Sequence, residues 1–329
     1  MAKEYRQNTN YNEIVNEEES KGKGRGGNKN ALAYGLLAGA HINTEGMSPS
    51  EAWAMVDALH LMDRQAKKKT AEEKEDYKNK NEQAKAQGKS KKTAIEKAGE
   101  FSERVALHSN NVSGLNEAIT TVVDVMSECK LDKLTKISTK QHIGSGIYSA
   151  LASANGAELN IGRDLLRNPG AFYRSSVENY KSAQKEEISM IEKELATVKS
   201  EKKKSDLQQV LQNKKDNLGY TRHNVVYKGE EVKSTIYHEM GHIIADQLCG
   251  QINGSKYMKT GISTQEAKQK RQLIEQTYIE CVGNQSIYKI SEYGGTNEHE
   301  FFAECYAMYK MGKEKLPENI EKMIEGVLK

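Results

Sequence analysis

Apolar residues recur at helical spacing in two long stretches of the chain. Residues 93–126 include Val105 and Leu115 in such a pattern, which predicts core helices. Residues 174–218 also keep helical spacing, but the polar run 200–205 interrupts its phase. A helix, a break and a second helix make a helical hairpin the simplest prediction for this region.

A different pattern separates these two stretches. Short runs of apolar and polar residues alternate between about residues 133 and 162, and Asn155-Gly156 lies between two of them. Asn-Gly favours the tight turn of a β-hairpin, so we predict a small antiparallel sheet here. His223–Tyr227 is also rich in β-forming residues and could be an edge strand on which an extended peptide pairs.

The first part of the chain is poor in apolar residues. Residues 1–30 are polar and end in a Gly- and Lys-rich run, which predicts a flexible arm. A serine N-cap, a first-turn proline and a capping-box glutamate predict a helix that starts near Pro49. Residues 64–92 then lack an apolar face. We therefore expect residues 31–92 to be a helical, highly charged extension.

The composition indicates the fold class and argues against nucleic acid as a required partner. The 329 residues are 36% hydrophobic and 29% charged, with only three prolines, which favours long helices beside the small sheet. An α+β fold is therefore expected. The net charge of +3 does not require nucleic acid as a partner. Residues 64–92 carry eleven basic and five acidic residues, and we interpret this excess as a solvated helix or arm.

Cysteine usage and the N-terminus bear on location. The four cysteines lie far apart without a CxxC pair, so we expect reduced thiols and neither a zinc ribbon nor a disulfide framework. The first residues lack the apolar stretch of a signal peptide, and no apolar run approaches about 18 residues. We therefore expect a cytoplasmic protein without a membrane partner.

The segment from His238 to His242 carries the clearest chemistry. It reads His-Glu-Met-Gly-His, which is the HExxH pattern of zinc peptidases. Positions i and i+4 lie above one another on a helix, so His238 and His242 can offer both imidazoles to one Zn²⁺. Glu239 is turned about 100° away, beside the metal, where a general base is needed.

A catalytic zinc needs a third protein ligand. The extended HExxHxxGxxH form is excluded, because Ala245 and Leu248 stand where it needs glycine and histidine. A glutamate from a later helix is the remaining source. This leaves the segment 297–304, which reads Asn-Glu-His-Glu-Phe-Phe-Ala-Glu.

Three glutamates and one histidine in this segment are candidates for the third ligand. Glu300 and Glu304 are four apart, so one can bind metal while the other braces it or a ligand histidine. Glu298 has a phenylalanine at that spacing and lacks such support. We choose Glu300 as ligand and Glu304 as its support, with His299 as the alternative ligand.

Residues 291–304, taken with the HExxH segment, resemble the catalytic domain of the anthrax toxin lethal factor family. That family comprises zinc metallopeptidases with an HExxH helix, a downstream glutamate ligand and an active-site tyrosine. The likeness is close from Glu230 to about Tyr309, weaker back to about Lys133, and absent before that. We therefore expect a zincin-like metallopeptidase domain over 93–329, in which the helical hairpin predicted from the sequence pattern is an insertion at about 174–218.

The same resemblance implies a role for each site residue. Zinc is expected at His238, His242 and Glu300, base chemistry at Glu239, and stabilisation of the oxyanion by Tyr293. The predicted function is that of a zinc-dependent endopeptidase, which hydrolyses peptide bonds of a peptide or protein substrate through a metal-activated water.

Domains of this type also occur in proteins of bacteriophages and mobile elements. The sequence shows no export signal and no recognisable cell-entry module, so we do not expect a toxin. The alternative function is a structural or interaction protein of a phage or mobile element that keeps a zincin-like fold. A phage or mobile-element protein partner and a virion-associated location belong to this hypothesis.

Overall fold

The computed structural model describes residues 71–72, 75–141, 143, 151–155, 157–250 and 264–329. The predicted arm and the helix start near Pro49 lie outside these residues. Contacts within the chain define two units, Met1–Lys78 and Asn79–Lys329. In the first unit, residues 71–72 and 75–78 are helical. The second unit contains the sheet and the HExxH segment, and the predicted boundary near residue 92 stays a prediction.

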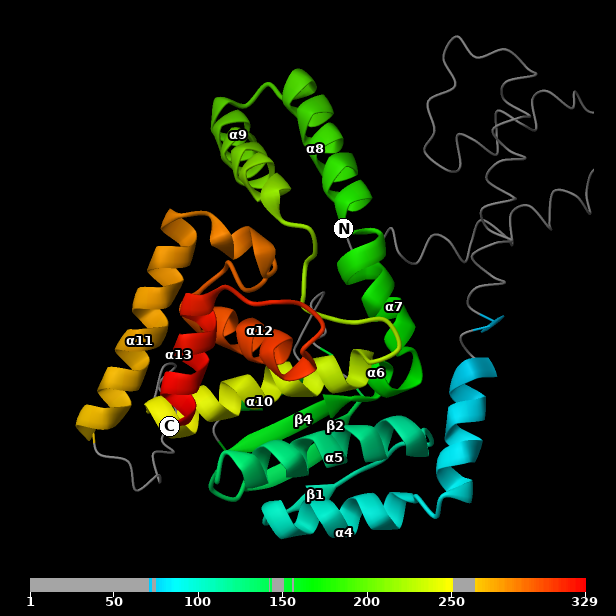
Figure 1. Ribbon diagram of the computed structural model, residues 1–329. Helices are drawn as coiled ribbons and strands as arrows, with labels where there is room; N and C mark the ends of the chain where they lie inside the picture. The colour runs from blue at the N-terminus through cyan, green and yellow to red at the C-terminus, as the bar shows by residue number, and fades with distance from the viewer. Residues whose placement is uncertain (1–70, 73–74, 142, 144–150, 156, 251–263) are drawn as a thin grey trace, which may run out of the picture. The chain divides into compact units, whose positions relative to one another are not determined.

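A small sheet and many helices make up the second unit, which confirms the predicted α+β class. The sheet has four strands in the order β1-β2-β4-β3 (Figure 1). The strands are β1 (Val105–Ala106), β2 (Lys136–Lys140), β3 (Ala152–Asn155) and β4 (Glu158–Gly162). The α-helices are α4 (Lys91–Phe101), α5 (Val112–Glu128), α6 (Arg163–Arg167), α7 (Pro169–Tyr173), α8 (Tyr180–Thr197), α9 (Glu201–Asp216), α10 (Glu231–Cys249), α11 (Thr264–Gly283), α12 (Glu298–Met311) and α13 (Glu318–Leu328).

The sheet is mixed, whereas the sequence pattern predicted an antiparallel one. β1 pairs with β2 and β2 pairs with β4 in parallel, and only β3 and β4 are antiparallel. Helix α5 crosses over between β1 and β2, and such a helical crossover allows the two strands to run in the same direction. The antiparallel pair is the predicted hairpin, in which Asn155 lies opposite Glu158. Val105, predicted in a helix, begins strand β1 after α4 has ended at Phe101.

Helices α8 and α9 form a hairpin beside the rest of the unit (Figure 1). Ser200 caps α9 by accepting a hydrogen bond from the Lys203 backbone N–H, so the polar run 200–205 does begin a new helix. No residue of α9 is buried, and ion pairs such as Lys203 with Glu194 link the two helices. The hairpin therefore contributes little to the core.

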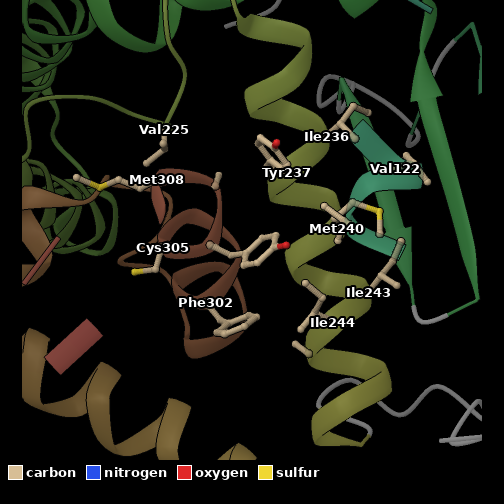
Figure 2. Close-up of a cluster of buried hydrophobic side chains, with 14 of the residues drawn as sticks. Val122, Val225, Ile236, Tyr237, Met240, Ile243, Ile244, Phe302, Cys305 and Met308 are labelled. Carbon is tan, nitrogen blue, oxygen red and sulfur yellow. The ribbon is translucent and has the colours of Figure 1, made fainter. Parts of the chain in front are cut away.

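Helix α10 runs through the centre of the core. Ile236, Met240 and Ile243 face helix α5 and the sheet, while Phe302 of α12 packs against its other side (Figure 2). A helix buried on both sides holds its side chains in fixed directions. None of the described helices is long and apolar enough to cross a membrane.

Gly241, inside the HExxH segment, allows α10 and α12 to approach closely. A Cβ atom at this position would lie 2.8 Å from the Cα atom of Ala303 on α12. That distance is too short for two carbon atoms, and the clashing atom belongs to the backbone. The glycine is therefore required by the close contact between the two helices.

We expect Gly241→Ala to lower the free energy of unfolding by about 1–3 kcal/mol, because the added methyl group overpacks the contact with Ala303. Chemical denaturation measures the change. Gly99→Ala is the matched control, since a Cβ atom at Gly99 in helix α4 meets nothing within 4 Å. The control should be neutral or up to about 1 kcal/mol more stable. Equal stability of the two variants would contradict the packing argument.

Candidate metal centre

Helix α10 presents two histidines to one point. His238 and His242 are one turn apart, and their Nε2 atoms lie 3.1 Å from each other. Both side chains are buried, with no more than 10% of either exposed. The burial of α10 on both sides fixes the direction of the two rings.

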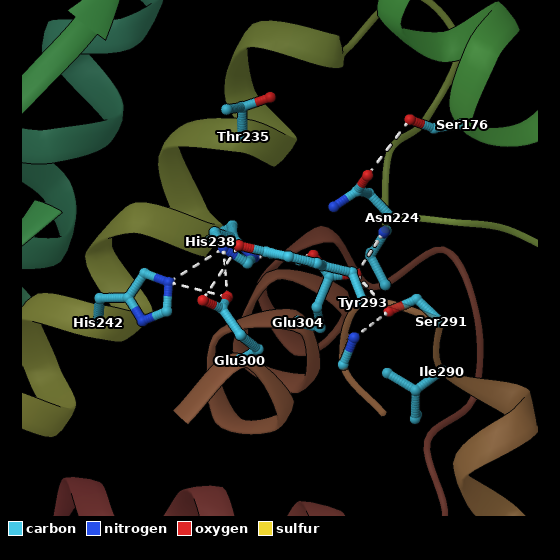
Figure 3. Close-up of polar contacts among 12 residues, drawn as sticks. Ser176, Asn224, Thr235, His238, His242, Ile290, Ser291, Tyr293, Glu300 and Glu304 are labelled. Carbon is cyan, nitrogen blue, oxygen red and sulfur yellow. Dashed lines mark hydrogen bonds and ion pairs between the residues drawn. The ribbon is translucent and has the colours of Figure 1, made fainter. Parts of the chain in front are cut away.

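Helix α12 supplies a carboxylate to the same point. The Asn297 side chain caps this helix by accepting hydrogen bonds from the backbone N–H groups of His299 and Glu300. The cap places Glu300 in the first turn, where its Oε2 atom lies 3.3 Å from His238 Nε2 and 3.2 Å from His242 Nε2 (Figure 3). The structure thus brings the three sequence-predicted ligands together.

The triangle formed by these three atoms fits a tetrahedral metal ion. Its edges measure 3.1, 3.2 and 3.3 Å. Zinc bonds of about 2.0–2.2 Å in tetrahedral geometry place ligand atoms about 3.3–3.6 Å apart, so a small outward movement of the three atoms would admit the ion. The described residues contain this one group of three ligand side chains able to hold a metal ion, and Glu300 Oε2 is buried there without a hydrogen bond. The donor set therefore suits a divalent cation such as Zn²⁺.

Glu304 holds one of the histidines in a definite orientation. Its Oε1 atom lies 2.7 Å from His238 Nδ1. Its Oε2 atom accepts hydrogen bonds from Ser291 Oγ at 2.6 Å and from the Val225 backbone N–H at 2.5 Å. A carboxylate at Nδ1 favours the imidazole tautomer whose Nε2 lone pair faces a metal. This is the supporting position that the sequence analysis predicted for Glu304.

His223–Tyr227, predicted as an edge strand, has no strand structure. The segment passes beside the site instead, and the Val225 N–H that a strand would use for pairing donates to Glu304. The strand prediction was wrong because the Val225 N–H donates to the Glu304 side chain of α12 and does not pair with a strand. The contributions of Val225 and Ser291 were also missed, since nothing local in the sequence indicates them.

Tyr293 lies directly over the candidate ligands. Its hydroxyl donates a hydrogen bond to Glu300 Oε1 at 3.1 Å, and its ring stacks on that of His238 at a centroid distance of 5.8 Å (Figure 3). Burial raises the pKa of Tyr293, and the nearby Glu300 carboxylate raises it further. The hydroxyl therefore stays protonated at neutral pH and is a hydrogen-bond donor at the metal position.

The electrostatics of the cluster favour a bound cation. Burial lowers the pKa of His238, but the adjacent Glu300 and Glu304 carboxylates outweigh that effect and raise it well above its usual value. Burial raises the pKa of Glu300, yet its contacts with the two histidines hold it well below the usual range. Burial lowers the pKa of His242 to about 4. A divalent ion can take the place of the proton that these groups share, because it satisfies the same negative charge.

Glu239 is the remaining carboxylate of the HExxH segment. It is only 6% exposed, and burial raises its pKa to about 7. The neighbouring His238 opposes this shift, while Glu300 adds to it. A carboxylate with a pKa near the working pH is suited to take up and return a proton.

His299 is close to the site but lies outside the group of three ligands. Its ring stacks on that of His242, with centroids 4.3 Å apart, and its Nε2 atom lies 3.6 Å from Asp246 Oδ1. Both side chains are buried. The sequence indicates His299 only as an alternative ligand. Nothing in the sequence singled out Asp246, although this residue follows His242 at the same four-residue spacing on α10.

Comparison with known families adds independent support. Residues 177–325 match the glucose-regulated metallo-peptidase M90 family. The match covers less than half of the chain, but it includes all the candidate ligands, Glu239, Tyr293 and the whole of the α8–α9 hairpin. It supports a metallopeptidase, which is a hydrolase of peptide bonds and uses a metal ion.

The lethal factor-like assignment and the phage hypothesis have no such support. The family match does not extend to the anthrax lethal factor-like assignment, and nothing supports a phage or virion partner. No curated protein and no solved structure matches the chain. The metallopeptidase assignment therefore combines this family match with the geometry of the cluster.

We expect Glu304→Gln to weaken zinc binding by about 10- to 100-fold, because the amide orients His238 less well than a carboxylate does. Competition with a fluorescent zinc chelator measures the affinity. Glu298→Gln is the control, since it removes a carboxylate from the first turn of the same helix, outside the group of three. Wild-type affinity in Glu304→Gln would show that this carboxylate does not support the site.

Proposed function

We propose that this protein is a zinc-dependent endopeptidase whose metal is held by His238, His242 and Glu300. The observation that supports it best is the triangle of two imidazole nitrogens and one carboxylate oxygen with edges of 3.1–3.3 Å. Three protein ligands leave one position of a tetrahedral ion for water or substrate, as catalytic zinc sites require. The substrate is a peptide or protein.

When bound, zinc supplies Lewis acidity, which lowers the pKa of water to about 7 and polarises a peptide carbonyl. Glu239 takes a proton from the attacking water and returns it to the leaving amine. Its buried position supports both steps, because burial disfavours the charged carboxylate and so makes Glu239 a stronger base than an exposed glutamate.

Tyr293 stabilises the oxyanion that forms when the carbonyl is attacked. Its hydroxyl donates to Glu300 Oε1. A small rotation of the side chain would let the same hydroxyl donate to the oxyanion instead. Glu304 holds the His238 ring in the orientation needed for metal binding. In this proposal, different side chains hold the metal, move the proton and stabilise the charge.

The proposal is tested by Glu239→Gln. This variant should bind zinc as the wild type does and lose activity on protein substrates by about 10²- to 10⁴-fold, which is the range for general acid–base catalysis. Peptide products detected by mass spectrometry and zinc content measured on the same samples check both parts. Glu325→Gln, at an exposed site on α13 whose carboxylate pairs with Lys329, is the matched control. Identical digestion by zinc-loaded Glu239→Gln and wild type would refute the peptidase assignment.

A further inference from the structure

We propose that Glu292 is a positioning residue that sets Tyr293 over the metal site by tying its loop to the base of the α8–α9 hairpin. The inference rests on the proposed function, because the oxyanion role of Tyr293 belongs to it. The hairpin otherwise has no part in the site, since its helices contribute no ligand and few buried side chains.

The Glu292 carboxylate is held from several sides. Its Oε1 atom accepts a hydrogen bond from Asn217 Nδ2 at 2.8 Å, and its Oε2 atom lies 3.0 Å from His223 Nδ1. Burial raises the pKa of Glu292, but hydrogen bonds from His223, Tyr180 and Asn217 hold it below the usual range. The Glu292 side chain is only 16% exposed, whereas that of His223 is 47% exposed, so the carboxylate is largely buried although its contact with His223 is open to solvent.

Two of these partners are the ends of the hairpin. Tyr180 is the first residue of α8, and Asn217 follows the last residue of α9. Gln184 joins them, because its Nε2 atom donates to the Tyr180 hydroxyl at 2.5 Å and reaches the Asn217 carbonyl at 3.3 Å. The base of the hairpin is therefore a closed polar cluster with Glu292 as its acceptor.

The third partner, His223, connects the cluster to Tyr293. The Tyr293 backbone N–H donates to the His223 carbonyl at 2.9 Å, and the ring centroids of the two residues are 5.9 Å apart. The ring of Tyr293 also stacks on His238, with centroids 5.8 Å apart. His223 and His238 therefore both contact the Tyr293 ring. A shift of His223 would disturb the backbone hydrogen bond and the ring contact that hold Tyr293.

Neighbouring residues of the loop are anchored to different parts of the molecule. Ser291 donates to Glu304, which also holds His238, while Glu292 binds the hairpin base. The loop that carries Tyr293 is thus fixed to the metal site on one side and to the hairpin on the other. Removing the second anchor should leave the metal ligands in place and release the tyrosine.

The test compares Glu292→Ala in the wild type and in a Tyr293→Phe background. We expect Tyr293→Phe to lower kcat by about 10²- to 10³-fold, as for loss of one oxyanion donor. Glu292→Ala should lower kcat by about 10- to 100-fold, since displacement of a catalytic group by about 1 Å costs up to that much. KM and zinc content should stay within about 2-fold of wild type, because substrate and metal contacts are unaffected.

In the Tyr293→Phe background, Glu292→Ala should cause no further loss, because it acts through the tyrosine hydroxyl. Glu292→Gln keeps an acceptor for Asn217 and should restore part of the rate. Asn217→Ala removes the same hydrogen bond from the hairpin side and should also lower kcat. Glu194→Gln removes the exposed ion pair to Lys203 at the far end of the hairpin and should behave as wild type.

Hydrogen–deuterium exchange of metal-free protein gives a readout that does not depend on activity. The Tyr293 amide, which donates to His223, should exchange faster in Glu292→Ala than in wild type or Glu194→Gln. Equal loss of kcat in both backgrounds, or unchanged exchange at Tyr293, would overturn the positioning role. Absence of Glu239-dependent hydrolysis would instead refute the proposed function, and the exchange result would still decide whether Glu292 holds the loop.

Discussion

The close packing of α10 on α12 is the contact on which the site depends. Both histidines come from α10, while the ligand Glu300 and the supporting Glu304 come from α12, so the distance between the helices sets how far each histidine lies from Glu300. Gly241 permits this approach because a larger residue would meet the backbone of Ala303. The same glycine lies between the two histidines in the chain, and the residue that allows the packing is therefore part of the motif that carries the chemistry.

Burial of several charged groups in one cluster is the main cost of this arrangement. Glu239, Glu300 and Glu304 are all brought into a space shared with only two basic side chains of the HExxH segment. Like charges in a poorly solvated site repel each other, and Glu300 and Glu304 both raise the pKa of Glu239. A divalent cation offsets this repulsion more effectively than a shared proton does. The charge balance and the ligand distances thus both favour a bound divalent cation.

The parts of the site that the sequence predicted depend on local spacing. His238, His242, Glu300 and Glu304 follow the four-residue period of a helix, and Asn297 caps the second helix by a local rule. The α+β class followed from apolar periodicity and the Asn-Gly turn in the same way. Such features need no knowledge of which elements meet in space.

The parts that were missed depend on contacts between distant segments. The parallel pairing of β2 with β4 is set by how the chain returns to the sheet, and no pattern in either strand specifies it. Val225 belongs to a segment with strand composition, yet its N–H donates to Glu304, which lies 79 positions further along the chain. Glu292 meets Asn217 across a similar separation. These interactions become visible only when the elements are placed together.

Anomalous diffraction at the zinc edge from crystals of the zinc-loaded protein tests the central claim most directly. We predict one strong peak bonded to His238 Nε2, His242 Nε2 and Glu300 Oε2 at about 2.0–2.2 Å, with a fourth position open to water. A peak elsewhere, or an ion bound by the two histidines while Glu300 points away and no other carboxylate takes its place, would contradict the account.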